Sequence, residues 1–495
     1  MAWSKQPDKM SFGYDAIVDK SRRKAPPTAP RHESKIVSQT DRRKLNATTQ
    51  DQRRNLSLVA WAYRMHLAFN TQFRLHVTTK DEGLNEAIED AFEWWALPTN
   101  CDVTNRHSLR RLCRLAEGHR FLDGDVGVLF TPDGRLQLIE GDRINNPSQG
   151  VPKKYQGINW NQGVELDRNG GAIQYMLCQR VNGGGSLAFD SVKTARNLKL
   201  YGYFERYDQH RGISPLSAAI NTFQDVYETW ELNVLKAKAH ALFGMVISRE
   251  SSGRGELGME QTETLTATDD DATQFAAERY ETTPEGIFKM ELAMGENVST
   301  IESKTPSDEL VNFTKLLSRA GFLAMDLPYS FFDSSDASYS AQRMDLILYE
   351  IGNAVKREPM QNLLQLIAKW KLSRWTRNDP REMGDSEPRI VLPRGIELEN
   401  LTYEWVPQGI PWVDPAKESK ADEAAIRNGL VSRTYIAKKR NLPRLRQTFD
   451  ELEREESEIS RRGITIQAAD PGAETINNIE ADSADGAVPA ITKAG

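Results

Sequence analysis

The stretch GISPLSAAINTFQDVYETWELNVLKAKAHALFG, residues 212–244, decides how the chain is organised. Ser214 suits the N-cap of a helix, where its hydroxyl can accept an unpaired backbone N–H, and Pro215 suits the first turn, where a missing N–H costs nothing. Apolar residues then recur at helical spacing as far as Phe243, and Gly244 is a natural C-terminal stop. The pattern predicts a helix of roughly 29 residues, about 43 Å long.

A second helix is predicted on the far side of an acidic insert. Residues 305–308, TPSD, read as a capping box with proline at the first helical position, and an apolar face continues from Leu310 to Ala320. The insert, residues 245–304, contains short strand patterns at 245–247, 287–292 and 298–301. Residues 245–306 carry 5 Lys/Arg against 13 Asp/Glu. We therefore expect two helices that flank a small acidic domain.

A loop of small polar residues joins the second helix to a long third helix. It covers residues 329–340, YSFFDSSDASYS, and has aromatic residues near both ends. The following helix is predicted over 341–376, and Pro359 falls inside it. An interior proline removes a backbone hydrogen bond and clashes with the preceding turn, so we expect a kink there.

The N-terminal part of the chain combines helical and strand patterns. Residues 1–45 are basic and poor in apolar side chains, which predicts an extended, mobile segment. Helical patterns and two hairpins with glycine-containing turns follow; the helices cover about 48–70, 82–96 and 107–118, and the hairpins pair 126–130 with 136–139 and 163–166 with 172–178. These elements predict an α+β fold with an antiparallel sheet.

The C-terminal part is predicted to be helical and then disordered. Asp414 and Pro415 begin a helix that ends at Gly429, Ser432 caps a short helix, and residues 444–462 form a charged helix. Residues 464–495 lack aromatic side chains, which predicts a disordered tail.

Composition excludes several classes of protein. The net charge of −6 over 495 residues argues against a dedicated sequence-reading DNA-binding domain, which is usually strongly basic. The charge is uneven, because residues 1–60 carry 13 Lys/Arg against 6 Asp/Glu. Three cysteines form no CxxC pair, which favours a reducing compartment. No uninterrupted apolar run is long enough to cross a bilayer, so we expect neither a standard secretion signal nor a membrane span.

Metal and nucleotide motifs are not found. The sequence contains no G-x-x-x-x-G-K-[ST] pattern, which argues against a P-loop motor. Cys101, His107, Cys113 and His119 recur every six residues. Six-residue steps rotate about 240° around a helix, so these side chains do not share one face, and the spacing fits no zinc pattern.

Clustered acidic residues are the remaining candidates for catalysis. Asp123 and Asp125 are explained most simply by a surface turn. Asp269, Asp270 and Asp271 lack the spaced ligands and glycine of a calcium loop, so we interpret them as a solvated acidic loop. We expect no enzyme, no bound metal and no cofactor.

The order of these segments resembles the lambda-type portal proteins of tailed bacteriophages, over roughly residues 12–463. Six motifs carry the resemblance besides the helical pattern of 56–73; they are GYDA (13–16), GVELDRNGGAIQY (163–175), GISPL (212–216), LPY with SYSAQR (327–329 and 338–343), WVDPAKE (412–418) and NGLVSR (428–433). The sequence departs from the family pattern at Ala341 and Gln342, and in the aromatic stretch 328–331.

The resemblance implies a ring of identical subunits, usually twelve, at one capsid vertex of the virion, assembled in the host cytoplasm. A separate terminase ATPase pumps double-stranded DNA through such a ring, and the DNA leaves by the same route. Further implied partners are the major capsid protein, the scaffold and head-completion adaptors. The implied segments are a wing (46–213), a stem helix (214–244), a clip (245–304), a second stem helix (305–328), a tunnel loop (329–340), a kinked tunnel helix (341–376), a wing return (377–411) and a crown (412–463).

The resemblance also places the tunnel loop against DNA. The predicted channel residues are Tyr329, Phe332, Asp333, Ser335, Asp336, Tyr339 and Arg343. Acidic and hydroxyl side chains suit contacts that re-form easily. Arg343 is the candidate for a phosphate contact, with a pair to an acid on the neighbouring subunit as the equal alternative.

Three questions stay open at the level of sequence. If the acidic clip triplet faces the channel, it would repel DNA phosphates and let the DNA slide. If it faces outward, it would bind basic partner proteins. A ring or capsid component without DNA passage would have a channel too narrow for duplex DNA. A metal-dependent nucleic-acid enzyme would use the acidic clusters with Mg²⁺.

Overall fold

The computed structural model describes residues 36–181, 183, 185–242, 245–249, 280–282, 288–290, 296–300, 308–335, 338–377, 387–394, 396–409, 415–440, 442 and 445–462. The acidic triplet predicted at 269–271, the residue Asp336 and the predicted tail 464–495 lie outside this part of the chain. Two compact units are present, one made of Met1–Thr71 and Asp81–Leu401, the other of Gln72–Lys80 and Thr402–Gly495.

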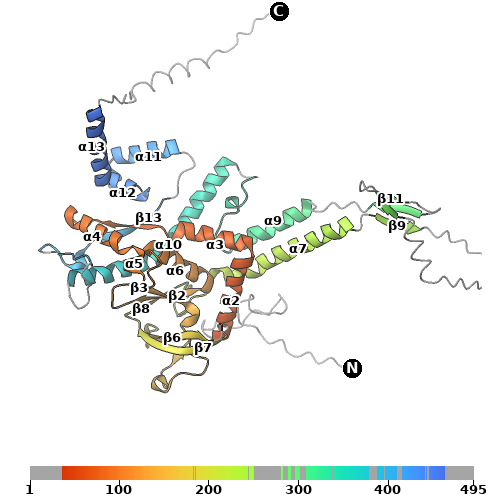
Figure 1. The fold of residues 1–495 in the computed structure, drawn as a ribbon, viewed down its shortest axis with the longest axis horizontal. Helices are drawn as coiled ribbons and strands as arrows, with labels where there is room; N and C mark the ends of the chain where they lie inside the picture. Colours follow the sequence, from red (N-terminus) through yellow and green to blue (C-terminus); the bar gives the residue numbers. More distant parts are fainter. Residues whose placement is uncertain are drawn as a thin grey trace, which may run out of the picture. The chain divides into compact units, whose positions relative to one another are not determined.

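The first unit begins with helices (Figure 1). They are α2 (Gln39–Asn55), α3 (Ser57–Asn70), α4 (Glu82–Trp95), α5 (Pro98–Cys101) and α6 (Leu109–Asp123). The prediction of an extended segment up to residue 45 is therefore wrong from Gln39 onward. Ser38 and Asp41 form a capping box, each side chain accepting the other's backbone N–H at 3.2 Å, and Leu45 is buried. Capping and burial of one apolar face outweigh the polar composition.

Both predicted hairpins are present, but they lie in two antiparallel sheets and not in one. In one, β2 (Asp125–Phe130) pairs with β3 (Leu136–Glu140) and β8 (Leu198–Gly202). In the other, the order is β4 (Trp160–Asn161), β5 (Val164–Leu166), β6 (Ala172–Val181) and β7 (Ser186–Thr194). The predicted turn glycines Gly134 and Gly170 have φ of +82° and +87°, a region that other residues rarely adopt.

The helix predicted from Ser214 is divided in two. A 3-10 turn, η5 (Pro215–Ala218), precedes α7 (Ile220–Leu242). The Ser214 hydroxyl caps the turn by accepting from Leu216 N at 3.1 Å, and it donates to Phe121 O at 2.7 Å. This tie to α6 fixes the turn apart from the helix. Residues 243–244 lie outside the described residues.

The partner helix α9 (Asp308–Leu323) runs antiparallel beside α7 (Figure 1). The rings of Phe223, near the start of α7, and Phe322, near the end of α9, lie 5.6 Å apart. Short strands lie between the two helices: β9 (Met245–Arg249) pairs with β12 (Glu296–Thr300), and β10 (Tyr280–Thr282) pairs with β11 (Phe288–Met290). Strands β9, β11 and β12 confirm the three predicted strand patterns, whereas β10 was not predicted.

The third long helix, α10 (Tyr339–Arg377), contains Pro359 as predicted. It begins two residues earlier than expected, because Ser338 Oγ accepts from Ala341 N at 3.3 Å at its start. The helix changes direction along its length (Figure 1). Residues 387–401 follow, with a 3-10 turn, η7 (Leu398–Asn400).

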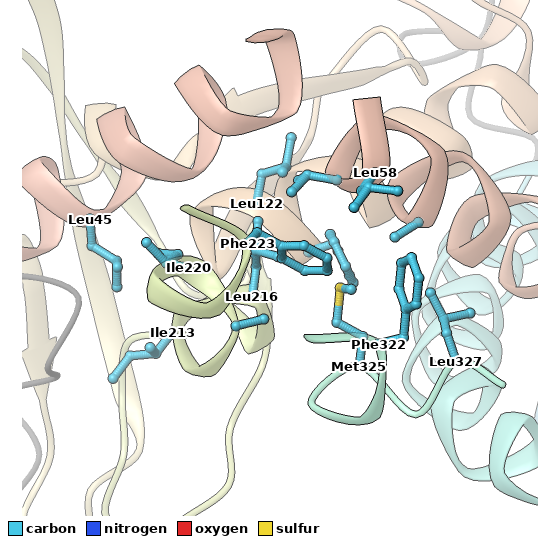
Figure 2. Close-up of a cluster of buried hydrophobic side chains, with 14 of the residues drawn as sticks. Leu45, Leu58, Leu122, Ile213, Leu216, Ile220, Phe223, Phe322, Met325 and Leu327 are labelled. Atoms are coloured by element: carbon cyan, nitrogen blue, oxygen red, sulfur yellow. The ribbon is translucent and has the colours of Figure 1, made fainter. Parts of the chain in front are cut away.

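An apolar core joins the helices of the first unit (Figure 2). Side chains from α2, α3, α6, η5, α7, α9 and the segment after α9 meet there; among them are Leu45, Leu58, Leu122, Ile213, Leu216, Ile220, Phe223, Phe322, Met325 and Leu327. Each such side chain contributes about 1.5–3 kcal/mol when it is fully buried. This core fixes the start of α7, the end of α9 and the segment that follows α9.

A buried ionic cluster lies beside the core, where the sequence predicted a surface turn. Arg211 holds Asp125 with two hydrogen bonds of 2.7 and 2.8 Å, and both side chains are at most 1% exposed. Arg42 Nη1 lies 3.7 Å from the same carboxylate, and Gly212 N donates to it at 2.8 Å. Burial works to raise the pKa of Asp125, but Arg211 keeps that pKa below its usual value.

Asp123 is also buried, so the surface-turn interpretation is wrong for both acids. His119 Nδ1 lies 2.8 Å from Asp123 Oδ2, and Gln50 Nε2 donates to Asp123 Oδ1 at 2.7 Å. Arg211, Arg42 and Gln50 come from segments distant in sequence, whereas His119 lies one turn before Asp123 on α6. These partners make burial of the charges tolerable.

The second unit pairs β1 (Phe73–Val77) with β13 (Tyr403–Pro407), antiparallel. The predicted C-terminal helices are α11 (Pro415–Arg427), α12 (Arg433–Lys439) and α13 (Leu445–Arg462). Ser432 caps α12 by accepting from Tyr435 N at 3.0 Å, and Gly429 has φ of +69°. Through the pairing of β1 with β13, Gln72–Lys80 belongs to the same unit as the segment from Thr402 onward.

All three cysteines are free and buried. Within the part of the chain that the structure covers, none of the helices is both long and apolar enough to cross a membrane.

Candidate functional site

The predicted tunnel loop has an aromatic base. Tyr329, Ser330 and Phe331 form a 3-10 turn, η6 (Tyr329–Phe331), directly after the core residue Leu327. The Phe331 ring lies 6.0 Å from Phe69 and 5.0 Å from Tyr349, and so contacts both α3 and α10. This base attaches the loop to three helices of the first unit.

Tyr329 and Phe332 also belong to this aromatic base. The Phe332 ring lies 5.7 Å from both Trp61 and Phe322, and 5.7 Å from Tyr329. The Arg319 guanidinium stacks 4.7 Å from the centre of the Tyr329 ring, a cation–π geometry. These contacts indicate that the two aromatic residues position the loop.

The polar part of the loop begins at Asp333. Its Oδ1 accepts from Ser335 N at 3.0 Å and from Ser335 Oγ at 2.6 Å, and Lys315 Nζ lies 3.5 Å from its Oδ2. The hydrogen bonds from Ser335 keep the pKa of Asp333 below its usual value, so the carboxylate is charged at neutral pH. Ser334 and Ser335 are exposed.

The start of α10 returns to the loop. Ser330 Oγ donates to Asp345 Oδ2 at 2.6 Å, which fixes the first turns of α10 against the base. Arg343 is exposed in these first turns. Tyr339 is the first residue of α10, but its side chain lies outside the described part of the chain, as does Asp336.

Of the predicted channel residues, the structure brings Tyr329, Phe332, Asp333 and Ser335 together, with Arg343 one to two helical turns into α10. The prediction missed Lys315 and Arg319, which approach the loop from α9. Their spacing of four residues, one helical turn, places both cations on one face and was the available signal.

The described residues contain no metal-binding cluster and no exposed cysteine. There, no group of three or more His, Cys, Asp or Glu side chains could hold a metal ion. Cys101 and Cys113 are buried, and burial raises the pKa of each thiol to about 12, so neither is a ready nucleophile.

A second buried charge cluster surrounds Glu117. His66 Nε2 lies 2.7 Å from Glu117 Oε1, Arg120 Nη1 donates to it at 2.9 Å, and the Tyr201 hydroxyl donates to Oε2. Burial lowers the pKa of His66 and works against the ionisation of Glu117, but Arg120 keeps the pKa of Glu117 below its usual value. Glu117 and His66 are at most 3% exposed, which makes this cluster a structural one.

Comparisons with known proteins agree with this picture. The family model described as "Phage portal protein, lambda family" matches residues 20–350, more than half of the chain. A probable portal protein of Halomonas phage phiHAP-1 is 24% identical over 359 residues, which cover 70% of this chain and 65% of that protein. The chain therefore matches slightly less than two thirds of the length of this curated relative.

Two solved structures are similar to this chain at a lower level, with TM-scores below 0.5. A chain from the neck of an empty gene transfer agent particle has a TM-score of 0.46 and 16% identity, and the match covers 87% of this chain and 98% of that one. An HK97 family phage portal protein from Corynebacterium diphtheriae has a TM-score of 0.28 and 12% identity, with 63% and 84% covered. On the match of the family model, which runs from before α2 into α10, the chain belongs to the lambda family of phage portal proteins.

Proposed function

We propose that identical copies of this chain form a ring at one capsid vertex of a virion, through which a terminase ATPase packages double-stranded DNA and through which the DNA leaves. The observation that carries the proposal is the family match over residues 20–350, which includes both stem helices and the loop between α9 and α10. In this assignment α7 and α9 are the stem, residues 329–340 are the tunnel loop, and α10 is the tunnel helix. The other proposed partners are the major capsid protein, the scaffold and head-completion adaptors.

The loop geometry supports a role in guiding DNA. The aromatic base holds the loop against Trp61, Phe322 and Phe69, so the polar part projects from a fixed position. The charged Asp333 repels phosphates weakly, and the serine hydroxyls beside it do not bind them tightly. Such a surface suits the passage of DNA of any sequence. A lumen lined with Lys or Arg would bind phosphates and resist movement.

Within this proposal, the predicted residues have different roles. Asp333, Ser335, Asp336 and Tyr339 form the part that meets DNA, Arg343 is the candidate phosphate contact, and Tyr329 and Phe332 position the loop. In the clip, Asp269, Asp270 and Asp271 supply negative charge, either toward the channel or toward basic partners. Repulsion of this kind acts within a Debye length of about 8–10 Å.

The experiment is a charge reversal, Asp333→Lys with Asp336→Lys, followed by measurement of packaged DNA per particle. We expect rings of normal size that package less DNA. The matched control is Asp51→Lys with Asp190→Lys, which changes the net charge equally at two exposed positions away from the loop. Normal packaging by the loop variant would contradict the role of the loop. A channel too narrow to admit a DNA duplex would contradict the portal function itself, and Mg²⁺-dependent cleavage of DNA would point to an enzyme.

A further inference from the structure

A hollow lined by apolar side chains lies between α7, α9 and the base of the loop. Its volume is about 460 Å³, and its walls include Trp230 and Val234 from α7, Leu310 and Val311 from α9, and Phe332. Val234 is 53% exposed and Phe332 is 45% exposed, so the hollow opens to the surface. We call this surface the stem pocket.

A stripe of apolar side chains runs along the first half of α10. Met344, Ile347, Leu348, Ile351 and Val355 are spaced as one helix face, with exposures from 45% for Ile347 to 70% for Val355. The opposite face, with Tyr349, Asn353 and Met360, is buried in the chain. We call the exposed face the α10 stripe.

The stripe does not suit the lining of a DNA channel. Duplex DNA presents phosphates, which interact with polar and charged groups, and five neighbouring aliphatic side chains offer none. Contiguous exposed apolar surface on a folded protein marks a contact with another apolar surface. The stem pocket is such a surface within the same chain.

The two surfaces also have the forms that a ring requires. A ring with rotational symmetry uses two different patches on each subunit, one for each neighbour, whereas a two-fold dimer uses the same patch twice. The stripe is convex and the pocket is hollow. They lie near each other along the chain, because Phe332 lines the pocket and Ser330, two residues earlier, is bonded to Asp345 beside the start of the stripe.

Charges at the borders of both surfaces allow pairing. Lys236 and Lys238 are exposed on either side of Ala237, which lines the pocket, and Glu350 is exposed beside Ile351 in the stripe. Asp308 and Glu309 precede Leu310 of the pocket; because α7 and α9 are antiparallel, they lie at the same end of the pocket as the two lysines, on the opposite wall. In the stripe, Arg343 precedes Met344. Each border therefore carries a cationic and an anionic part that the other can complement.

We propose that the α10 stripe of one subunit packs into the stem pocket of the next, so that this head-to-tail contact closes the ring. The proposal rests on the proposed function, because it names which surfaces join the subunits of that ring. It places the base of the tunnel loop, through Phe332, at the junction between neighbours.

The test uses two full-length variants, Ile351→Glu in the stripe and Val234→Glu in the pocket. Each alone is expected to remain a folded monomer of 55.9 kDa. Mixed in equal amounts, they should form a heterodimer of twice the chain mass and nothing larger. The first variant keeps its pocket and the second keeps its stripe, so only one junction per pair is intact. Native mass spectrometry resolves these species, and circular dichroism checks that each variant is folded.

The control is Val391→Glu, at a position that is 78% exposed and outside both surfaces, and it should assemble as the wild type does. A second readout is the double variant Ile351→Cys with Val234→Cys, which should give a ladder of disulfide-linked multimers on oxidation. The native cysteines are buried and should give little background.

The outcomes separate this proposal from the proposed function. Stripe and pocket variants that form rings as readily as the control would overturn the docking and leave the portal function intact. A ring that forms without the disulfide ladder would do the same. A wild-type chain that forms no rings, together with a double-cysteine variant that forms no ladder, would count against both proposals.

Discussion

Replacing Arg211 with methionine should destabilise the first unit by about 3–5 kcal/mol. The change leaves the Asp125 carboxylate, which is 0% exposed, with only Gly212 N at 2.8 Å and Arg42 at 3.7 Å as partners that remain. It also removes the donors to Gly141 O and Gln162 O, both held at 2.7 Å by the guanidinium. Each buried acceptor left without a partner costs about 1–3 kcal/mol, and the apolar methionine side chain offsets part of that loss.

The assay is urea unfolding followed by tryptophan fluorescence, with the wild type and variant compared at the same low protein concentration. The matched control is Arg180→Met, which removes an arginine that is 40% exposed and pairs with Asp142 at 2.6 Å. A surface pair of this kind contributes about 1 kcal/mol or less. Equal losses for Arg211→Met and Arg180→Met would refute the conclusion that the Asp125 cluster stabilises the fold through its burial.

The Asp125 cluster also predicts how the unfolding free energy changes with pH in acid. The pKa of Asp125 is lower in the folded protein than the roughly 3.9 of an unfolded chain, so the unfolded state binds more protons near pH 4. The stabilisation from Asp125 is therefore complete above about pH 4 and is lost as the pH falls through its folded pKa. Asp125→Asn should flatten this part of the curve of unfolding free energy against pH, relative to the wild type.

Three further predictions concern other buried positions. Lys371 is 0% exposed and lies 2.7 Å from Glu387, and burial lowers its pKa to about 8. Above pH 8 the unfolded state therefore binds more protons than the folded state, so the unfolding free energy of the wild type rises toward pH 10. Lys371→Met should abolish this rise, on the order of 3 kcal/mol, when unfolding is measured against pH. Gly212→Ala should cost about 1–3 kcal/mol in urea unfolding, because the new Cβ would overlap Gly124 O, whereas Gly185→Ala, with nothing within 4 Å, should be close to neutral. Phe322→Ala should cost about 3–5 kcal/mol in the same assay and increase proteolytic cleavage between α9 and α10, since Phe322 packs against the Phe332 ring.

Local chemistry predicted the elements of this fold well. The caps at Ser214 and Ser432, the turn at Gly134 and the interior Pro359 are all in the predicted places, because each depends on the residue itself and its near neighbours. Helix limits were less accurate. The division of the helix predicted from Ser214 depends on a hydrogen bond to Phe121, which is 93 residues away.

Long-range pairing is what the sequence could not predict. Asp125 and Arg211 are 86 residues apart, and a pair of neighbouring acids in sequence looks the same whether its partners are distant arginines or water. Strand β1 pairs with β13, which follows α10 in the sequence, and this pairing joins Gln72–Lys80 to the second unit. The aromatic residues of the loop are a second example. The sequence shows that Tyr329 and Phe332 are aromatic, but it does not show that Trp61 and Phe322 pack against them.

The position of Phe332 connects the loop to assembly. Its ring contacts Trp61 and Phe322 on one side and lines the stem pocket on the other, where it is still 45% exposed in the single chain. If the stripe of a neighbouring subunit fills the pocket, Phe332 becomes enclosed on both sides, and the base of the loop is held more firmly in the ring than in the monomer. Asp333, the next residue, would then be placed by the neighbour as much as by its own chain. The position of the loop would then depend on the contact between neighbouring subunits. A change in that contact would move the adjacent loop through the Phe332 side chain.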